Sequence, residues 1–117
     1  MKNQRNISTK TIKSLYAHSG NTCAFPGCNQ MLAYREDLIL SNICHIYGLN
    51  PGSARYDDTK TADYLNSEQN LLLLCHTHHD LIDKDEKNYP AETLMSMKLS
   101  WESYVKEIGR ASCRERV

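Results

Sequence analysis

The feature that most constrains the fold of this chain is a set of metal-binding side chains in two widely separated pairs. Cys23 and Cys28 flank the turn dipeptide Pro26-Gly27. Much later in the chain, Cys75 is followed three residues on by His78, a spacing that suits the end of a strand leading into a helix. Thiolate and imidazole are preferred ligands of Zn²⁺, and a structural zinc site closes with four of them in a tetrahedron. We therefore expect these four residues to hold a structural Zn²⁺.

These cysteines also have alternative interpretations. One alternative is a disulfide between Cys23 and Cys28. Another is that Cys75 is simply a buried core thiol after four leucines. The N-terminal sequence MKNQRNISTK lacks the apolar segment of a signal peptide, so we expect a cytoplasmic protein. In that compartment paired cysteines are more often metal ligands than disulfides, which favours the zinc site.

A second pair of metal-binding side chains follows directly. His78 and His79 are adjacent and point in different directions, so they do not serve the same ion. His79 and Asp83 are four residues apart and share one face of a helix. An imidazole with a carboxylate forms an open site for Mg²⁺, Mn²⁺, Ni²⁺ or Zn²⁺, so we expect a second ion here. The alternative for Asp83 is a surface acid beside the charged residues 84–87.

The hydrophobic pattern places these ligands on a small α+β framework. It predicts, in chain order, helix 8–18, strand 38–46, strand 71–74, helix 76–83 and a helix from Ala91. The polar segment 47–69 is predicted to be a long loop whose length favours a functional role. The last helix carries an apolar stripe that we expect to pack over the core, made of Leu94, Met97, Trp101, Tyr104, Val105 and Ile108.

Three further residues make the pattern specific. His45 in CHI, Asn70 in NLLLLC and His79 in HTHHD match the three residues that give the HNH endonucleases their name. The chain resembles HNH endonucleases of the ββα-metal, treble-clef-like type, which carry a structural zinc, and the likeness runs from about Ser8 to Ile108. The stretch HIYGLNPGSARYD and the ending HH…ID resemble one subgroup of that family.

The resemblance implies roles for His45, Asn70 and His79, and the side-chain chemistry of Asp83 and Arg55 suggests a role for each of these two. His45 is expected to be the general base, since its ordinary pKa suits proton transfer near neutral pH. Asn70 is expected to hold the loop that carries His45. His79 and Asp83 are expected to hold the catalytic ion, Mg²⁺ or another divalent metal. Arg55 is expected to contact a DNA phosphate, and its alternative is an ordinary exposed loop arginine.

Two residues that adjoin predicted site residues, Cys44 and His76, are expected to take no part in metal binding. Many family members carry Asp or His immediately before the base, whereas this chain has Cys44. A thiol is a poor ligand for Mg²⁺, so we expect Cys44 to be a small buried strand residue. His76 is expected to be solvated or to contact phosphate.

Composition sets the limits of this interpretation. The 117 residues leave room for one domain, and with 40% hydrophobic residues the core should be modest, so a bound zinc would contribute much of the folding free energy. Residues Gly109–Val117 resemble the translation of a sequencing adapter, with a genuine basic tail as the alternative. We therefore expect a nuclease domain over residues 1–108. The tail carries a net charge of +2 and the whole chain is neutral, so residues 1–108 carry −2.

These observations lead to one expected function and one alternative. The resemblance implies metal-dependent hydrolysis of DNA as the expected function, and the likeness to the subgroup implies that this domain is the N-terminal effector part of a longer anti-phage defence protein. Because the net charge predicts weak affinity for DNA, we expect help from a homo-oligomer or from a missing C-terminal sensor domain. No apolar run is long enough for a membrane span. The alternative is a zinc-stabilised nucleic-acid-binding or interaction module without catalysis.

Overall fold

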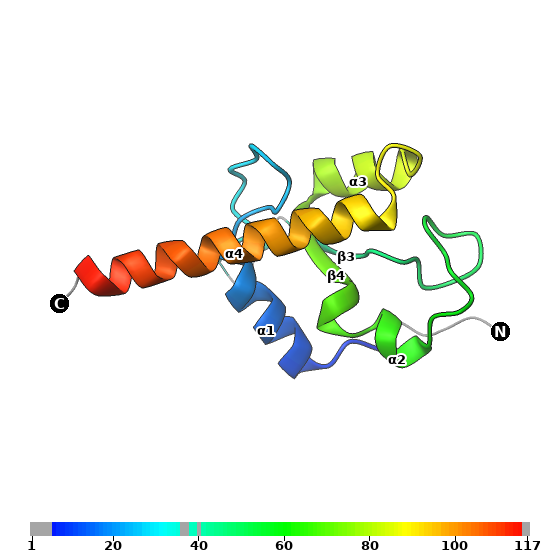
Figure 1. Ribbon diagram of the computed structural model, residues 1–117, viewed down its shortest axis with the longest axis horizontal. Coiled ribbons are helices and arrows are strands. Elements are labelled where there is room, and N and C mark those ends of the chain that lie inside the picture. Colours follow the sequence, from blue (N-terminus) through cyan, green and yellow to red (C-terminus); the bar gives the residue numbers. More distant parts are fainter. Residues whose placement is uncertain (1–5, 36–37, 40, 116–117) are drawn as a thin grey trace.

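The centre of the molecule is a two-stranded antiparallel sheet followed by a helix. The computed structural model describes residues 6–35, 38–39 and 41–115. Strand β3 (Ser41–His45) pairs with β4 (Leu71–Cys75), with Ser41 opposite Cys75 and His45 opposite Leu71. Helix α3 (His76–Lys84) begins directly after β4. The predicted α+β fold with a ββα unit is therefore confirmed (Figure 1).

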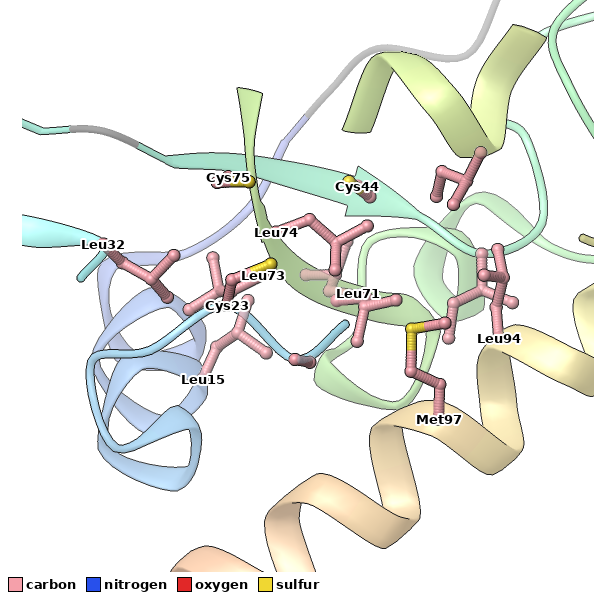
Figure 2. Close-up of a cluster of buried hydrophobic side chains, with 14 residues drawn as sticks. Leu15, Cys23, Leu32, Cys44, Leu71, Leu73, Leu74, Cys75, Leu94 and Met97 are labelled. Atoms are coloured by element: carbon pink, nitrogen blue, oxygen red, sulfur yellow. The ribbon is translucent and has the colours of Figure 1, made fainter. Parts of the chain in front are cut away.

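Strand β4 is buried along its whole length, because helices cover it on more than one side. Its four leucines form the middle of the hydrophobic core, and α1 (Thr9–Ser19) and α3 both contact it. Leu15 reaches the core from α1, and Leu94 and Met97 reach it from α4 (Ala91–Glu115), as Figure 2 shows. A strand buried on both faces reads as a continuous apolar run, which is how LLLL appears in the sequence.

Helix α1 begins and ends where its sequence indicates. The Ser8 hydroxyl accepts a hydrogen bond from the backbone N–H of Thr11 at 3.1 Å, which is the N-cap interaction expected of serine. Gly20 ends the helix with φ 62°, in the left-handed region that favours glycine. A Cβ at Gly20 would also lie 3.1 Å from Val105 of the last helix, so the helices pack closely there.

The last helix, α4 (Ala91–Glu115), covers the core with only its first part. Leu94 and Met97 are buried, and the indole Nε1 of Trp101 donates to the carbonyl of Ser19 at 2.7 Å. Tyr104 and Ile108 are 56% and 45% exposed, and Figure 1 shows α4 continuing past the rest of the domain. The expectation that the whole stripe packs over the core is therefore wrong for these two outer positions. The helix continues beyond Ile108, and the domain boundary there remains a prediction.

The segment predicted to be one long loop contains two short helical elements. These are α2 (Ala62–Leu65) and the 3-10 turn η1 (Glu68–Asn70), which leads straight into β4. The predicted strand 38–46 is also divided, since Leu38–Ile39 (β2) pairs with Ala33–Arg35 (β1) and only Ser41–His45 pairs with β4. Within residues 6–35, 38–39 and 41–115, no helix has the length and apolarity needed to cross a membrane.

Burial in β4 gives a direct test of this core. Replacing Leu73, which is 2% exposed, with Ala leaves a cavity between the helices. We expect the free energy of unfolding to fall by about 2–5 kcal/mol, as measured by urea denaturation. Leu99→Ala is the matched control, because Leu99 is 58% exposed and its loss should change stability by only about 0.5 kcal/mol. Equal effects of the two changes would contradict the described packing.

Candidate metal centre and active site

Four side chains from distant parts of the chain meet in one group. The ligand atoms of Cys23, Cys28, Cys75 and His78 all lie within 4.8 Å of one another. The Sγ atoms of Cys23 and Cys75 are 3.6 and 3.3 Å from Nδ1 of His78. Tetrahedral zinc, with Zn–S of about 2.3 Å and Zn–N of about 2.0–2.1 Å, puts such ligands about 3.5 Å apart. The predicted set is therefore assembled with a spacing that fits a zinc ion.

Each pair of ligands is positioned by its own backbone geometry. The first pair lies on a turn in which Cys28 N–H donates to the carbonyl of Phe25 at 3.0 Å, with Gly27 at φ 81°. Ala24 N–H donates to the carbonyl of Leu73 at 3.2 Å, which ties this turn to β4. The second pair lies where β4 meets α3: Cys75 is the last residue of β4, and His78 is in the first turn of α3. Both side chains meet the thiols of the Cys23–Cys28 turn.

An aromatic ring holds the histidine of this group. Phe25 stacks on His78 with ring centroids 4.0 Å apart and an interplanar angle of 1°. The stacked ring restricts rotation of the imidazole while Nδ1 faces the thiols. This role of Phe25 was not identified from the sequence. The available signal was its position in the CAFPGC turn, between two of the residues expected to bind the metal.

The pKa of the Cys23 thiol indicates that this group of ligands requires a bound cation. Burial, with smaller contributions from the neighbouring Cys28 and Cys75 thiols, raises the pKa of the Cys23 thiol to about 12. A thiolate at this position therefore depends on a bound cation, which deprotonates coordinating thiols. Cys23 and Cys28 are free thiols, so the alternative of a disulfide between them is not what the structure contains.

His45, the predicted base, lies at the end of β3 and is half-buried. Its Nε2 is 3.2 Å from Oδ1 of Asn66, the residue that ends α2. The next residue, Ile46, donates its N–H to the backbone carbonyl of Asn70 at 2.8 Å. Backbone bonds thus continue the β3–β4 pairing to the residue after the histidine.

Asn70 is completely buried and makes three side-chain hydrogen bonds. Its Oδ1 accepts from Tyr47 N–H at 2.8 Å, and its Nδ2 donates to the carbonyls of Tyr47 and Leu65 at 3.1 and 3.0 Å. One amide therefore holds the backbone two residues after His45 and the backbone at the end of α2. This geometry is compatible with the expected role of Asn70 in fixing the loop that carries His45, and that role remains a prediction.

His79 and Asp83 face each other on α3. Nε2 of His79 is 3.1 Å from Oδ2 of Asp83, close to the spacing of about 3 Å between adjacent ligands of an octahedral ion with bonds near 2.1 Å. Burial opposes ionisation of Asp83, but hydrogen bonds from His79 and Arg55 outweigh it and hold the pKa of this carboxyl below its usual value. The predicted pair therefore presents an ionised carboxylate beside an imidazole.

The other ring nitrogen of His79 faces β3. Nδ2 of Asn42 lies 3.0 Å from His79 Nδ1, so the ring proton is on Nε2 in this arrangement. A metal ion on Nε2 would require the proton on Nδ1, and turning the Asn42 amide over would present Oδ1 to accept it. Asn42 is thus the outer partner of this histidine, and sequence reasoning did not identify it.

Arg55 occupies a position that the sequence did not suggest. Its side chain is 5% exposed, so the alternative of an ordinary exposed arginine is wrong. Nε donates to the carbonyl of Ile46 at 2.7 Å, Nη1 to that of Ile82 at 2.9 Å, and Nη2 to Oδ1 of Asp83 at 2.7 Å. The guanidinium therefore joins the backbone next to His45 to the carboxylate of the second metal pair. Contact between Arg55 and a phosphate remains a prediction.

The structure brings together some predicted groups and keeps others apart. Among the described residues, the Cys₃His set is the only group of three or more His, Cys, Asp or Glu side chains with ligand atoms this close. The pair His79 and Asp83 therefore has no third such ligand there, and His45 contacts Asn66 instead. Cys44 is 1% exposed and belongs to the core, as expected, and His76 is exposed.

Comparison with known proteins agrees with this geometry. A family model described as HNH endonuclease matches residues 23–86, which is more than half of the chain. No curated protein matches this chain. Because the match spans the metal-binding group and every residue of the predicted active site, this chain belongs to the HNH endonuclease family.

Proposed function

We propose that this protein is a metal-dependent endonuclease that hydrolyses phosphodiester bonds in DNA, with His45 as general base. The family match supports a nuclease-type function. The observation that carries the proposal for this chain is the buried amide of Asn70, which holds the backbone beside His45 through two hydrogen bonds to Tyr47. A fully buried polar side chain that orients the end of a strand is expected where the end of that strand holds a catalytic residue.

The reaction requires a proton acceptor, and His45 is placed to be one. A neutral imidazole accepts a proton from water near neutral pH, where a carboxylate is a weaker base. The hydrogen bonds on both sides of the strand end restrict the ring, so that it meets the attacking water in one orientation. Cleavage in this manner leaves a 5′-phosphate and a 3′-hydroxyl.

The catalytic ion is proposed to bind at His79 and Asp83, as Mg²⁺ or another divalent metal. A bound ion would supply stabilisation of the charge on the phosphate and on the leaving oxygen. The chain's part is to present both donors 3.1 Å apart and to keep the carboxylate ionised. Arg55 contributes by holding the other oxygen of Asp83 at 2.7 Å.

The ion at the Cys₃His group is proposed to be structural Zn²⁺. The group has four protein donors, two of them buried thiols, and a site with four protein ligands has no open position for substrate. Zinc here would join the Cys23–Cys28 turn to the start of α3, and so fix the helix that carries His79 and Asp83.

The substrate and the biological setting follow from resemblance rather than from charge. The chain is neutral overall, so tight DNA binding by this domain alone is not expected. Exposed Lys10 and Lys13 on α1 offer some positive charge. The loop that resembles one subgroup of the family supports a role as the effector part of an anti-phage defence protein, with affinity supplied by oligomerisation or by another domain.

A second candidate is a zinc-stabilised nucleic-acid-binding or interaction module without catalysis. The observation that favours it is that both ring nitrogens of His79 already face protein groups, Asn42 and Asp83. A binding module needs neither His45 nor a second ion, so the two candidates differ in what happens when His45 is removed.

Removal of the base separates these candidates. We expect His45→Ala to reduce plasmid nicking by at least about 100-fold, because general-base catalysis contributes at least this much, while zinc content and melting temperature stay unchanged. His18→Ala is the matched control, since His18 is an exposed histidine on α1. Equal cleavage by His45→Ala and the wild type would reject the assignment of the base.

Loss of a zinc ligand should unfold the domain. We expect Cys75→Ser to lose the bound zinc, measured by elemental analysis, and to lose its cooperative thermal transition, measured by circular dichroism. Cys44→Ala is the control, because Cys44 is also a buried cysteine but lies outside the ligand group, and this variant should retain one zinc per chain. A native-like melting curve for zinc-free Cys75→Ser would contradict the structural site.

The second ion can be tested apart from cleavage. We expect Asp83→Asn to weaken Mn²⁺ binding, measured by electron paramagnetic resonance, by roughly ten- to a hundredfold because one of the two protein ligands loses its charge. Asp80→Asn, an exposed carboxylate on the same helix, should bind Mn²⁺ as the wild type does. Unchanged binding in Asp83→Asn would place the ion elsewhere.

A further inference from the structure

The contact between His45 and Asn66 has a defined direction. Nδ2 of Asn66 donates to the carbonyl of Ala62 at 3.3 Å, and Oδ1 lies 3.2 Å from His45 Nε2. Turning the amide over would set two oxygens against each other at Ala62 and two nitrogens against each other at His45 whenever Nε2 carries a proton. The hydrogen bond to Ala62 therefore fixes Oδ1 as the atom that faces the imidazole.

This direction determines where the imidazole carries its proton. An amide oxygen only accepts hydrogen bonds, so Nε2 of His45 has to donate. A neutral imidazole has one N–H, and with that proton on Nε2 the lone pair is on Nδ1. Asn66 thus selects one of the two neutral tautomers of the ring.

The two residues are held in register by the same buried amide. Asn70 donates to the carbonyl of Leu65, next to Asn66, and accepts from Tyr47, two residues after His45. Helix α2 is itself fixed, because Leu65 is fully buried and the Thr61 hydroxyl accepts from Tyr64 N–H at 3.2 Å. The position of Asn66 beside His45 is therefore fixed by a rigid element, helix α2, and not by a flexible loop.

Helix capping alone does not account for the orientation of Asn66. The backbone N–H and the Nδ2 of this residue both serve the end of α2 by donating to Ala62, and neither uses Oδ1. Asn66 also lines an open polar hollow with Asp63 and Ser67, so its side chain is not needed to fill the core. Oδ1 instead faces the imidazole of His45.

We propose that Asn66 is a positioning residue for His45, which keeps the proton on Nε2 so that Nδ1 is the nitrogen that accepts the proton from water. This inference rests on the proposed function for its catalytic meaning. The tautomer itself is a property of the folded protein and can be measured whether or not DNA is cleaved.

The test compares three variants of the zinc-loaded protein by nitrogen-15 NMR of the His45 ring at about pH 8.5, where the imidazole is neutral. Asn66→Ala removes the acceptor, Asn66→Asp keeps an acceptor oxygen, and Gln69→Ala removes an exposed amide from the same segment. We expect the wild type, Asn66→Asp and Gln69→Ala to carry the proton on Nε2. Asn66→Ala should show a mixture of both tautomers.

Plasmid nicking by the same proteins completes the test. We expect kcat of Asn66→Ala to fall by roughly ten- to a hundredfold, the usual cost of losing a partner that orients an imidazole, with little change in KM. Asn66→Asp should recover most of this loss, and Gln69→Ala should match the wild type.

Three results would overturn the inference. They are a wild-type ring protonated on Nδ1, the same tautomer in Asn66→Ala as in the wild type, or a changed tautomer with unchanged kcat. Failure of the proposed function looks different, because the wild type would then lack nicking altogether. In that case the NMR comparison alone decides whether Asn66 sets the tautomer of His45.

Discussion

The contact between the Cys23–Cys28 turn and the junction of β4 with α3 is the constraint on which the rest of the site depends. The turn is fixed to β4 by the hydrogen bond from Ala24 to Leu73, and its thiols meet Cys75 and His78. That meeting sets the direction in which α3 leaves the strand. Once α3 is set, His79 faces Asn42 of β3, and Asp83, one turn further along, reaches Arg55 in the loop that follows β3. The metal-binding group is therefore distinct from the proposed catalytic residues, although His78 adjoins His79, and it fixes the helix that carries His79 and Asp83.

The features that could be predicted from the sequence are those encoded by neighbouring residues. Ser8 and Gly20 mark the ends of α1 because a cap and a left-handed residue are local requirements. The run of leucines predicts a strand buried on both faces, and β4 has this burial. The Cys₃His group was identifiable as a metal-binding set because two short spacings, Cys23 to Cys28 and Cys75 to His78, each suit one turn of backbone. None of these predictions required knowing which segments pack together.

The features that could not be predicted depend on contacts between distant segments. Arg55 was expected near a phosphate, since nothing in RYD indicates that three backbone carbonyls from other segments surround its guanidinium. Asn66 lies in a polar stretch without a motif and Asn42 in the mainly apolar segment 38–46, and their partners His45 and His79 are 21 and 37 residues away. A short helix such as α2 has too little periodicity to detect. Its position comes from the burial of Leu65 and the hydrogen bond from Asn70.

The two halves of the proposed site come from different elements, and polar side chains rather than apolar packing relate them. Leucine contacts are non-directional, so they fix the position of a strand but not the direction of an imidazole or a carboxylate. Asn70 and Arg55 provide that direction, since each donates hydrogen bonds to backbone carbonyls from more than one segment beside the site. Among the described residues, no buried side-chain nitrogen or oxygen lacks a hydrogen-bond partner. Arg55 contacts both the backbone after His45 and Asp83, so a change in the loop that carries it would alter the base and the metal pair together.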